Sequence, residues 1–182
     1  ISEKFKLKEE INIITNGTLI SDDLIEIFKG FNVQLAISID GPKEVHDSTR
    51  VFKDGSGTYE KILPSLEKLK KEGVTFGVSC TIGPHNVNNL IQNIKLFKEL
   101  GAGGVGFNIL LKAKNKETPF ISINQSNDNL MEASFFAGEN NLYEDRIQRK
   151  IKPFNKKENP RFKDCGAAGN QIVFYTNGDI GI

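Results

Sequence analysis

Short apolar segments alternate with segments of helical periodicity along the first 111 residues, and this alternation limits the possible folds most strongly. The apolar runs are too continuous for a sheet that is wetted on one face, so they predict a parallel sheet covered by helices. Right-handed crossovers then curl the sheet toward a barrel or a doubly wound sheet. The predicted strands are 11–15, 33–40, 74–82 and 105–111, and the predicted helices are 22–30, 59–72 and 86–100.

The composition is that of a globular chain. Of 182 residues, 38% are hydrophobic and 26% charged, and 24 basic residues against 23 acidic ones give a net charge of +1. This balance gives no overall electrostatic preference for nucleic acid or for an acidic membrane surface. The chain begins with Ile1, without an initiator Met or a signal-peptide pattern, which suggests a trimmed or excised piece.

Cysteine and histidine limit the chemistry further. The chain has only two of each, Cys80 and Cys165, His46 and His85, and they lack the paired spacing of a four-ligand metal site. Two isolated thiols favour a reducing, cytoplasmic setting.

The pattern changes after Leu111. Residues 112–129 are polar and loop-like, 130–151 suggest one poorly amphipathic helix, and 171–182 suggest a strand, a turn at Asn177-Gly178 and the start of a second strand. Eight basic residues lie between Arg146 and Lys163. We interpret them as a solvated helix end and linker, because few aromatic residues are interleaved with them.

The carboxyl ends of parallel strands form the binding edge of such sheets. The segment 37–50, ISIDGPKEVHDSTR, carries the most polar groups at this edge. Ser38 and Asp40 alternate along a strand and share a face, and Ser38 with Arg50 could hold an amino acid's carboxylate. The alternative is an ordinary strand end with capping polar groups. His46 and Asp47 are interpreted as a structural capping pair, and Cys80 as a core residue.

Three segments together resemble one family. TNGTLI (15–20), SIDGPKEVHDSTR (38–50) and GSGTYEKILPSLEKLKKEGV (55–74) are similar to the radical S-adenosylmethionine (SAM) enzymes that modify peptides and proteins, among them the anaerobic sulfatase-maturing enzymes. The tail from Cys165, CGAAGNQIVFYTNGDI, resembles the start of that family's SPASM extension, which binds auxiliary iron-sulfur clusters.

The resemblance implies an α/β fold, a partial (β/α) barrel with barrel strands three to six, followed by the start of a C-terminal β-hairpin extension. The expected parts are a barrel core over 1–125, a helical and basic linker over 126–164, and a truncated SPASM-like segment over 165–182. The family's CxxxCxxC motif, which binds the SAM-cleaving [4Fe-4S] cluster, is absent. We therefore expect the chain alone to be inactive and to bind neither SAM nor a cluster.

For the intact enzyme, the resemblance implies reductive cleavage of SAM at a [4Fe-4S] cluster and hydrogen abstraction from a peptide or protein substrate. Ser38 and Arg50 would bind the methionine moiety of SAM. Asn16 and Asn108 would line the SAM or substrate site, and Asp40 would order the loop that carries Arg50. Cys165 would ligate an auxiliary cluster.

Two other functions remain open at this point. One is a non-catalytic peptide-binding or scaffold domain with a barrel-like sheet. The other is a barrel aldolase or lyase that uses a lysine Schiff base, for which Lys112 is the candidate. We also expect self-association through an unpaired strand edge if the sheet lacks its first strands.

Overall fold

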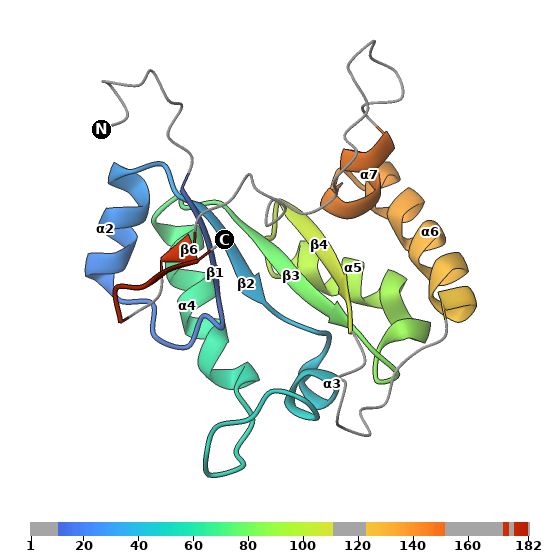
Figure 1. Ribbon diagram of the computed structural model, residues 1–182, viewed down its shortest axis with the longest axis horizontal. Coiled ribbons are helices and arrows are strands. Elements are labelled where there is room, and N and C mark those ends of the chain that lie inside the picture. The colour runs from blue at the N-terminus through green and yellow to red at the C-terminus, as the bar shows by residue number, and fades with distance from the viewer. Residues whose placement is uncertain (1–10, 111–122, 152–172, 175–176, 182) are drawn as a thin grey trace. The chain divides into compact units, whose positions relative to one another are not determined.

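The computed structural model describes residues 11–110, 123–151, 173–174 and 177–181. The chain divides into two compact units, 1–148 and 149–182. The first is built on a parallel sheet with the strand order β1-β2-β3-β4-β5. Strands β1 to β4 can be followed in Figure 1. Its strands are β1 (Asn12–Thr15), β2 (Gln34–Ser38), β3 (Phe76–Ile82), β4 (Gly104–Ile109) and β5 (Tyr143–Glu144).

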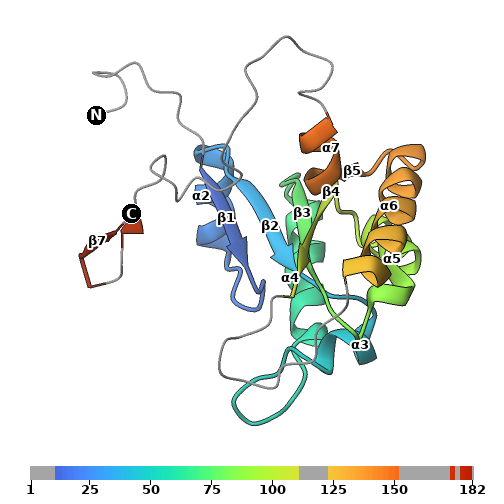
Figure 2. The same ribbon diagram turned by 45° about the vertical axis from the view of Figure 1, so that its right-hand side comes forward.

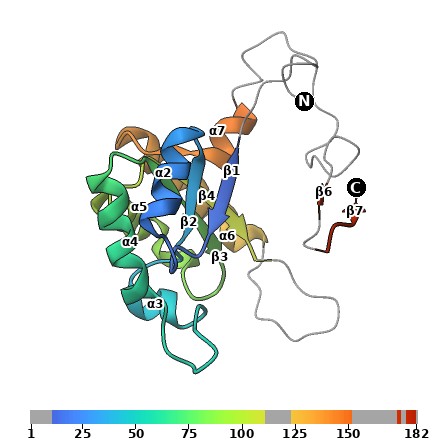
Figure 3. The same ribbon diagram turned by 90° about the vertical axis from the view of Figure 1, so that its left-hand side faces the viewer.

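Helices follow each of the first three strands. Figure 3 shows α2, α4 and α5 on the same side of the sheet. In Figure 2, α6 lies beside α5. The helices are α2 (Asp22–Gly30), α3 (Lys43–Asp47), α4 (Tyr59–Lys71), the 3-10 turn η1 (Val87–Asn89), α5 (Leu90–Glu99), α6 (Ile123–Glu139) and α7 (Asp145–Ile151). None of these described helices has the length and apolar character needed to span a lipid bilayer.

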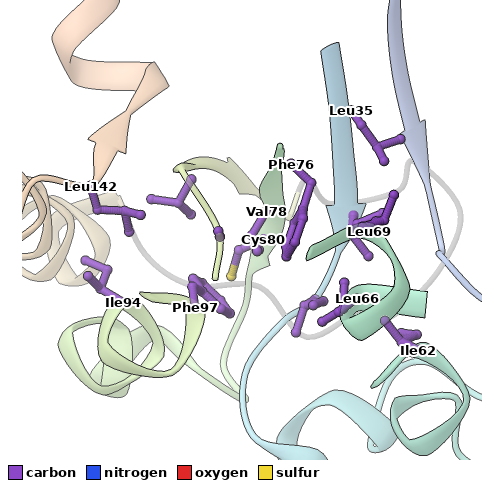
Figure 4. Close-up of a cluster of buried hydrophobic side chains, with 14 of the residues drawn as sticks. Leu35, Ile62, Leu66, Leu69, Phe76, Val78, Cys80, Ile94, Phe97 and Leu142 are labelled. Atoms are coloured by element: carbon purple, nitrogen blue, oxygen red, sulfur yellow. The ribbon is translucent and has the colours of Figure 1, made fainter. Parts of the chain in front are cut away.

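The core lies between the sheet and these helices. Alternate strand residues such as Leu35 and Val78 face it, and Leu66 and Leu69 of α4 and Phe97 of α5 pack from the other side (Figure 4). Fully burying a side chain of this kind contributes about 1.5–3 kcal/mol. This one-sided core fixes which strand residues remain for the opposite face.

The opposite face of β2, β3 and β4 is built of small and polar residues. In the strand register, Ala36 lies beside Gly77, Ser38 beside Ser79, and Ser79 beside Gly106. The backbone at Gly106 is open, because an added Cβ would meet nothing within 4 Å. On this face the two serines therefore lie next to a glycine whose side-chain position is empty among the described residues.

The four predicted strands and three predicted helices are confirmed, with ends that differ by a few residues. Ser21 caps α2 as its sequence position suggests, and its Oγ accepts a hydrogen bond from the Leu24 amide (3.3 Å). Together with the parallel register, these elements confirm the partial barrel.

Three details of the prediction were wrong. The segment 41–57, for which the sequence predicts no helix, contains α3, and the helix expected over 130–151 is two helices, α6 and α7, separated by β5. The loop expected over 112–129 is helical from Ile123 onward. Elements of two to five residues are too short to produce a periodic apolar pattern, which is why the sequence did not reveal α3 and β5.

The second unit contains a small hairpin. Strands β6 (Val173–Phe174) and β7 (Ile180–Gly181) pair in antiparallel fashion. Gly178 has a φ of +89°, a left-handed conformation that glycine adopts without strain. The hairpin predicted around Asn177-Gly178 is therefore confirmed.

Candidate functional site

An ion pair marks the carboxyl end of β2. The Arg50 guanidinium meets both oxygens of the Asp40 carboxylate, with Nε–Oδ2 at 2.6 Å and Nη2–Oδ1 at 3.1 Å. The side chain of Asp40 is 3% exposed and that of Arg50 28% exposed. The Arg50 side chain therefore lies at the strand end, as the sequence suggests, but two of its guanidinium nitrogens are already bonded to a carboxylate of the same chain.

Asp40 is also bonded to the neighbouring strand and helix. Its Oδ1 accepts from the Thr81 amide at 2.8 Å. Its backbone carbonyl accepts from the side-chain amides of Asn86 (2.8 Å) and Asn93 (3.2 Å). These bonds join the ends of β2 and β3 to α5, so that the expected role of Asp40 in ordering Arg50 has a structural basis.

The loop between β2 and α4 is tied down by a buried histidine. His46 is fully buried, and its Nδ1 accepts from the Asp40 amide at 3.3 Å. Its Nε2 must then carry the proton and donate to Thr58 Oγ1 (2.9 Å), whose hydroxyl donates to the Arg50 carbonyl (3.2 Å). Burial lowers the pKa of His46, opposed by the nearby Asp40 carboxylate.

Asp47 completes this structural role. Its Oδ1 accepts from the amide of Tyr59, the first residue of α4, at 2.9 Å. Thr58 itself makes no side-chain capping bond to α4, although the sequence suggests that it would. His46 and Asp47 are therefore a structural pair that holds the loop carrying Arg50, and the sequence interpretation of the two is confirmed.

A second polar cluster lies on the opposite face of the sheet from the core. Asn108 of β4 donates from Nδ2 to Ser79 Oγ at 3.2 Å. Its Oδ1 accepts from Nη2 of Arg146, whose Nε also donates to the carbonyl of Phe107 (3.0 Å). Glu144, which is fully buried, orients the start of α7 by accepting from the amides of Arg146 and Ile147, each at 2.8 Å.

The structure brings together some of the predicted site residues and not others. Ser38 is in register with Ser79, on the strand that leads into Asp40, but among the described contacts Ser38 and Arg50 do not touch each other. Asn16 is exposed and uses its Oδ1 within its own turn, accepting from the Thr18 amide (3.2 Å) and hydroxyl (3.0 Å). Cys165 and Lys112 lie outside the described residues.

Sequence reasoning missed two residues that the geometry places at the site, Ser79 and Arg146. Thr81 and Asn86 fall within the strand-end segments that the sequence predicts as the binding edge, whereas Ser79 belongs to the site only through its cross-strand neighbours. Arg146 was interpreted as part of a solvated basic stretch, yet it binds β4. The signal that could have identified Ser79 is its alternation with Thr81 toward the end of a strand; nothing local identifies Arg146.

The described residues do not offer a site for an iron-sulfur cluster. Cys80 is fully buried in the core, and burial raises the pKa of its thiol well above the usual value. No group of three or more Cys, His, Asp or Glu in the described ranges is arranged to hold a metal ion. Two hydroxyl groups, those of Ser38 and Ser79, lie in register on neighbouring strands, and Ser79 lies beside Gly106, where an added Cβ would meet nothing within 4 Å.

Comparisons with known proteins agree with this architecture. The family described as the Radical SAM superfamily matches residues 1–97. A serine-type anaerobic sulfatase-maturating enzyme of Bacteroides thetaiotaomicron is 34% identical over 95 residues, which are 52% of this chain and 23% of that protein. An AdoMet-dependent heme synthase of Methanosarcina barkeri is 35% identical over 92 residues, 50% of this chain and 26% of that protein.

Solved structures show the same fold. The structure described as native anSMEcpe with bound AdoMet and Kp18Cys peptide has a TM-score of 0.73 at 23% identity, over 83% of this chain and 44% of that one. SuiB from Streptococcus suis has a TM-score of 0.68 at 11% identity, over 98% and 44% of the two chains. Matches to the curated relatives above cover about a quarter of their length. Because the family match covers more than half of the sequence, the chain belongs to the radical SAM superfamily.

Proposed function

We propose that this chain is the central part of an enzyme that cleaves SAM and modifies a peptide or protein, and that its role is to hold the methionine end of SAM. The observation that carries this proposal is the Asp40–Arg50 pair at the end of β2, two residues beyond Ser38. This ion pair supports the proposal because it fixes the end of the strand next to the Ser38 hydroxyl, which lies on the face of the sheet opposite the core.

In this proposal Ser38 and Arg50 bind the ligand, and other residues hold them in place. Ser38 donates its hydroxyl proton to the methionine carboxylate. Asp40 holds Arg50 through Nε and Nη2. The third guanidinium nitrogen, Nη1, is not used by this ion pair, and it donates its N–H groups to the same ligand. His46 and Thr58 hold the loop, so Arg50 needs no rearrangement when SAM binds.

The radical chemistry itself comes from the cofactors, because SAM and a reduced [4Fe-4S] cluster together supply the means to remove a hydrogen atom from the substrate. Among the described residues no group of three or more Cys, His, Asp or Glu is placed to hold a metal ion, and we assign SAM binding to this part of the chain. We further propose that Cys165 ligates an auxiliary cluster of a SPASM-like extension, at the start of the segment that contains the β6–β7 hairpin.

A peptide or protein substrate is proposed on two grounds. The curated relatives include sulfatase-maturating enzymes of the serine and cysteine types. Three of the solved structures with this fold are described as holding a peptide or a precursor peptide. The heme synthase among the relatives shows that similarity in this region alone does not fix the substrate.

The test uses the complete protein that carries this chain. Arg50→Ala should abolish SAM cleavage while the visible absorption of the clusters stays unchanged. The matched control is Lys43→Ala, which removes an exposed cation of the neighbouring helix. Unchanged cleavage by the Arg50 variant would refute the assignment.

Iron content tests the proposal for Cys165. Cys165→Ala should lower the iron bound per complete protein, whereas Cys80→Ala, which alters a core thiol, should leave it unchanged. Equal iron in the Cys165 variant and the unaltered protein would contradict the role as a ligand. A scaffold without catalysis would bind no SAM, and the absence of SAM binding by the complete protein would favour that alternative.

A further inference from the structure

The hydroxyl of Ser79 has a direction that its neighbours impose. Ser79 Oγ accepts a hydrogen bond from Asn108 Nδ2, and none of the described residues accepts the Ser79 hydroxyl proton in return. That proton is therefore available to a group outside the described contacts. Ser79 lies beside Ser38 in the strand register, with the open position of Gly106 on its other side.

Arg146 determines this direction through Asn108. A guanidinium has donors and no acceptor, so the atom of Asn108 that faces Arg146 must be the amide oxygen. The amide nitrogen is then forced toward Ser79. With the amide reversed, its oxygen would face Ser79 and take the hydroxyl proton for itself.

We propose that Ser79 is a second hydroxyl donor to the ligand carboxylate that Ser38 binds, and that Arg146 is a positioning residue that keeps Ser79 in the donating state through Asn108. This inference rests on the proposed function, because it takes the SAM methionine carboxylate as the ligand. It adds a relay across β3, β4 and α7 that the sequence did not predict.

The geometry suits a carboxylate. Neighbouring strands lie about 4.8 Å apart, so two hydroxyls in register can reach the two oxygens of one carboxylate. A hydrogen bond to a charged group is stronger than one to a neutral group, so the loss of the Ser79 donor should weaken binding measurably. Arg146 is well placed for the relay, because Phe107 and Asn108 together fix its guanidinium.

The decisive variant is Asn108→Asp, which keeps the size of the side chain and still accepts from Arg146. A carboxylate also accepts from Ser79 and draws its proton away from the ligand. We expect this variant to raise the dissociation constant of SAM, measured by equilibrium dialysis on the complete protein, by about tenfold or more. Ser79→Ala should give a similar increase, and Arg146→Met a smaller one.

A double variant distinguishes two causes of weaker SAM binding. One is loss of the donating Ser79 hydroxyl through Asn108, and the other is charge repulsion between the introduced carboxylate and SAM. In a Ser79→Ala background, Asn108→Asp should change SAM affinity less than about twofold, because the donor is already gone. A loss as large as in the unaltered background would overturn the relay, since repulsion between the introduced carboxylate and the ligand does not require Ser79. Ser48→Ala, which removes a hydroxyl bonded to the Val45 carbonyl, is the control and should bind SAM normally.

A second ligand identifies the group that Ser79 binds. Methylthioadenosine lacks the amino-acid end of SAM, so its affinity should be unchanged by Ser79→Ala. An equal loss for both ligands would overturn the assignment to the carboxylate. If the unaltered protein binds no SAM, the proposed function fails together with this inference; if it binds SAM and the Ser79 and Asn108 variants bind it equally well, the inference alone fails.

Discussion

Asp40 and Arg50 form a two-point ion pair whose two members are unequally buried, 3% against 28% of the side chain exposed. The carboxylate is also bonded to the Thr81 amide, so it is compensated on two sides. The guanidinium retains one nitrogen, Nη1, that the pair does not use. The pair therefore ties the loop after β2 to the strand end and leaves Nη1 outside the ion pair.

The unequal burial predicts an asymmetry between single substitutions. Arg50→Met leaves a buried carboxylate without its cation and should lower the free energy of unfolding by about 2–4 kcal/mol. Asp40→Asn should cost less, because the partly exposed guanidinium can be hydrated and the amide oxygen can still accept from Thr81. Urea unfolding measures both. Lys43→Met, which removes an exposed lysine from its pair with Asp47, should change stability little. An Asp40→Asn variant that is less stable than Arg50→Met would contradict this account.

The buried histidine predicts a pH dependence of stability. Burial lowers the pKa of His46 in the folded protein, so between that pKa and the unfolded value near 6.5 the unfolded chain binds more protons. The contribution of neutral His46 to the free energy of unfolding is complete above pH 6.5. It is lost as the pH falls toward the folded pKa, by up to about 1.4 kcal/mol per pH unit.

Burial also lowers the pKa of His85, which adds a second contribution of the same sign. The free energy of unfolding should decline as the pH falls below 6.5, and His46→Gln should make this decline less steep. Adding His85→Gln should make it less steep again. A slope that His46→Gln leaves unaltered would show that the imidazole is not neutral in the folded state.

Gly57 allows Asp47 to approach the start of α4. A Cβ at Gly57 would lie 2.1 Å from Asp47 Cγ, so an alanine there must displace the carboxylate that accepts from the Tyr59 amide. We expect Gly57→Ala to lower unfolding free energy by about 1–2 kcal/mol, the range for a lost helix cap. Gly30→Ala, whose Cβ would meet nothing within 4 Å, should not destabilise. In an Asp47→Ala background the Gly57 substitution should cost much less; an undiminished cost would place the clash elsewhere.

The edge strand predicts self-association of the isolated chain. Among the described strands β1 pairs only with β2, and Ile14 on β1 is 68% exposed. An unpaired apolar edge favours pairing between chains, and a lysine on such an edge opposes it. Light scattering should detect oligomers of the 182-residue chain and fewer of them for Ile14→Lys. A monomer at all concentrations would contradict the prediction.

The fold could be predicted where a single segment carries the signal. Strands β2 and β3 are buried on their core side along their whole length, so their apolar runs are visible in the sequence. Strand β5 could not be predicted, because Tyr143–Glu144 is too short for a pattern and pairs only through tertiary contact. The same reason hides α3, whose five residues include the buried His46.

The site was predictable to a similar extent. The alternation of Ser38 and Asp40 and the nearby Arg50 lie within one short segment, and the structure keeps Asp40 and Arg50 in contact. The relay from Arg146 to Ser79 joins three elements that are far apart in the chain. No spacing rule connects such residues, because only the strand register places them side by side.

The most direct test of the central claim is a crystal structure of the complete protein with SAM bound. The account predicts that an oxygen of the methionine carboxylate lies within about 3 Å of Ser38 Oγ, with Arg50 still paired to Asp40 and its Nη1 directed to the ligand. A carboxylate bound elsewhere, with Ser38 and Arg50 both out of contact with SAM, would contradict it.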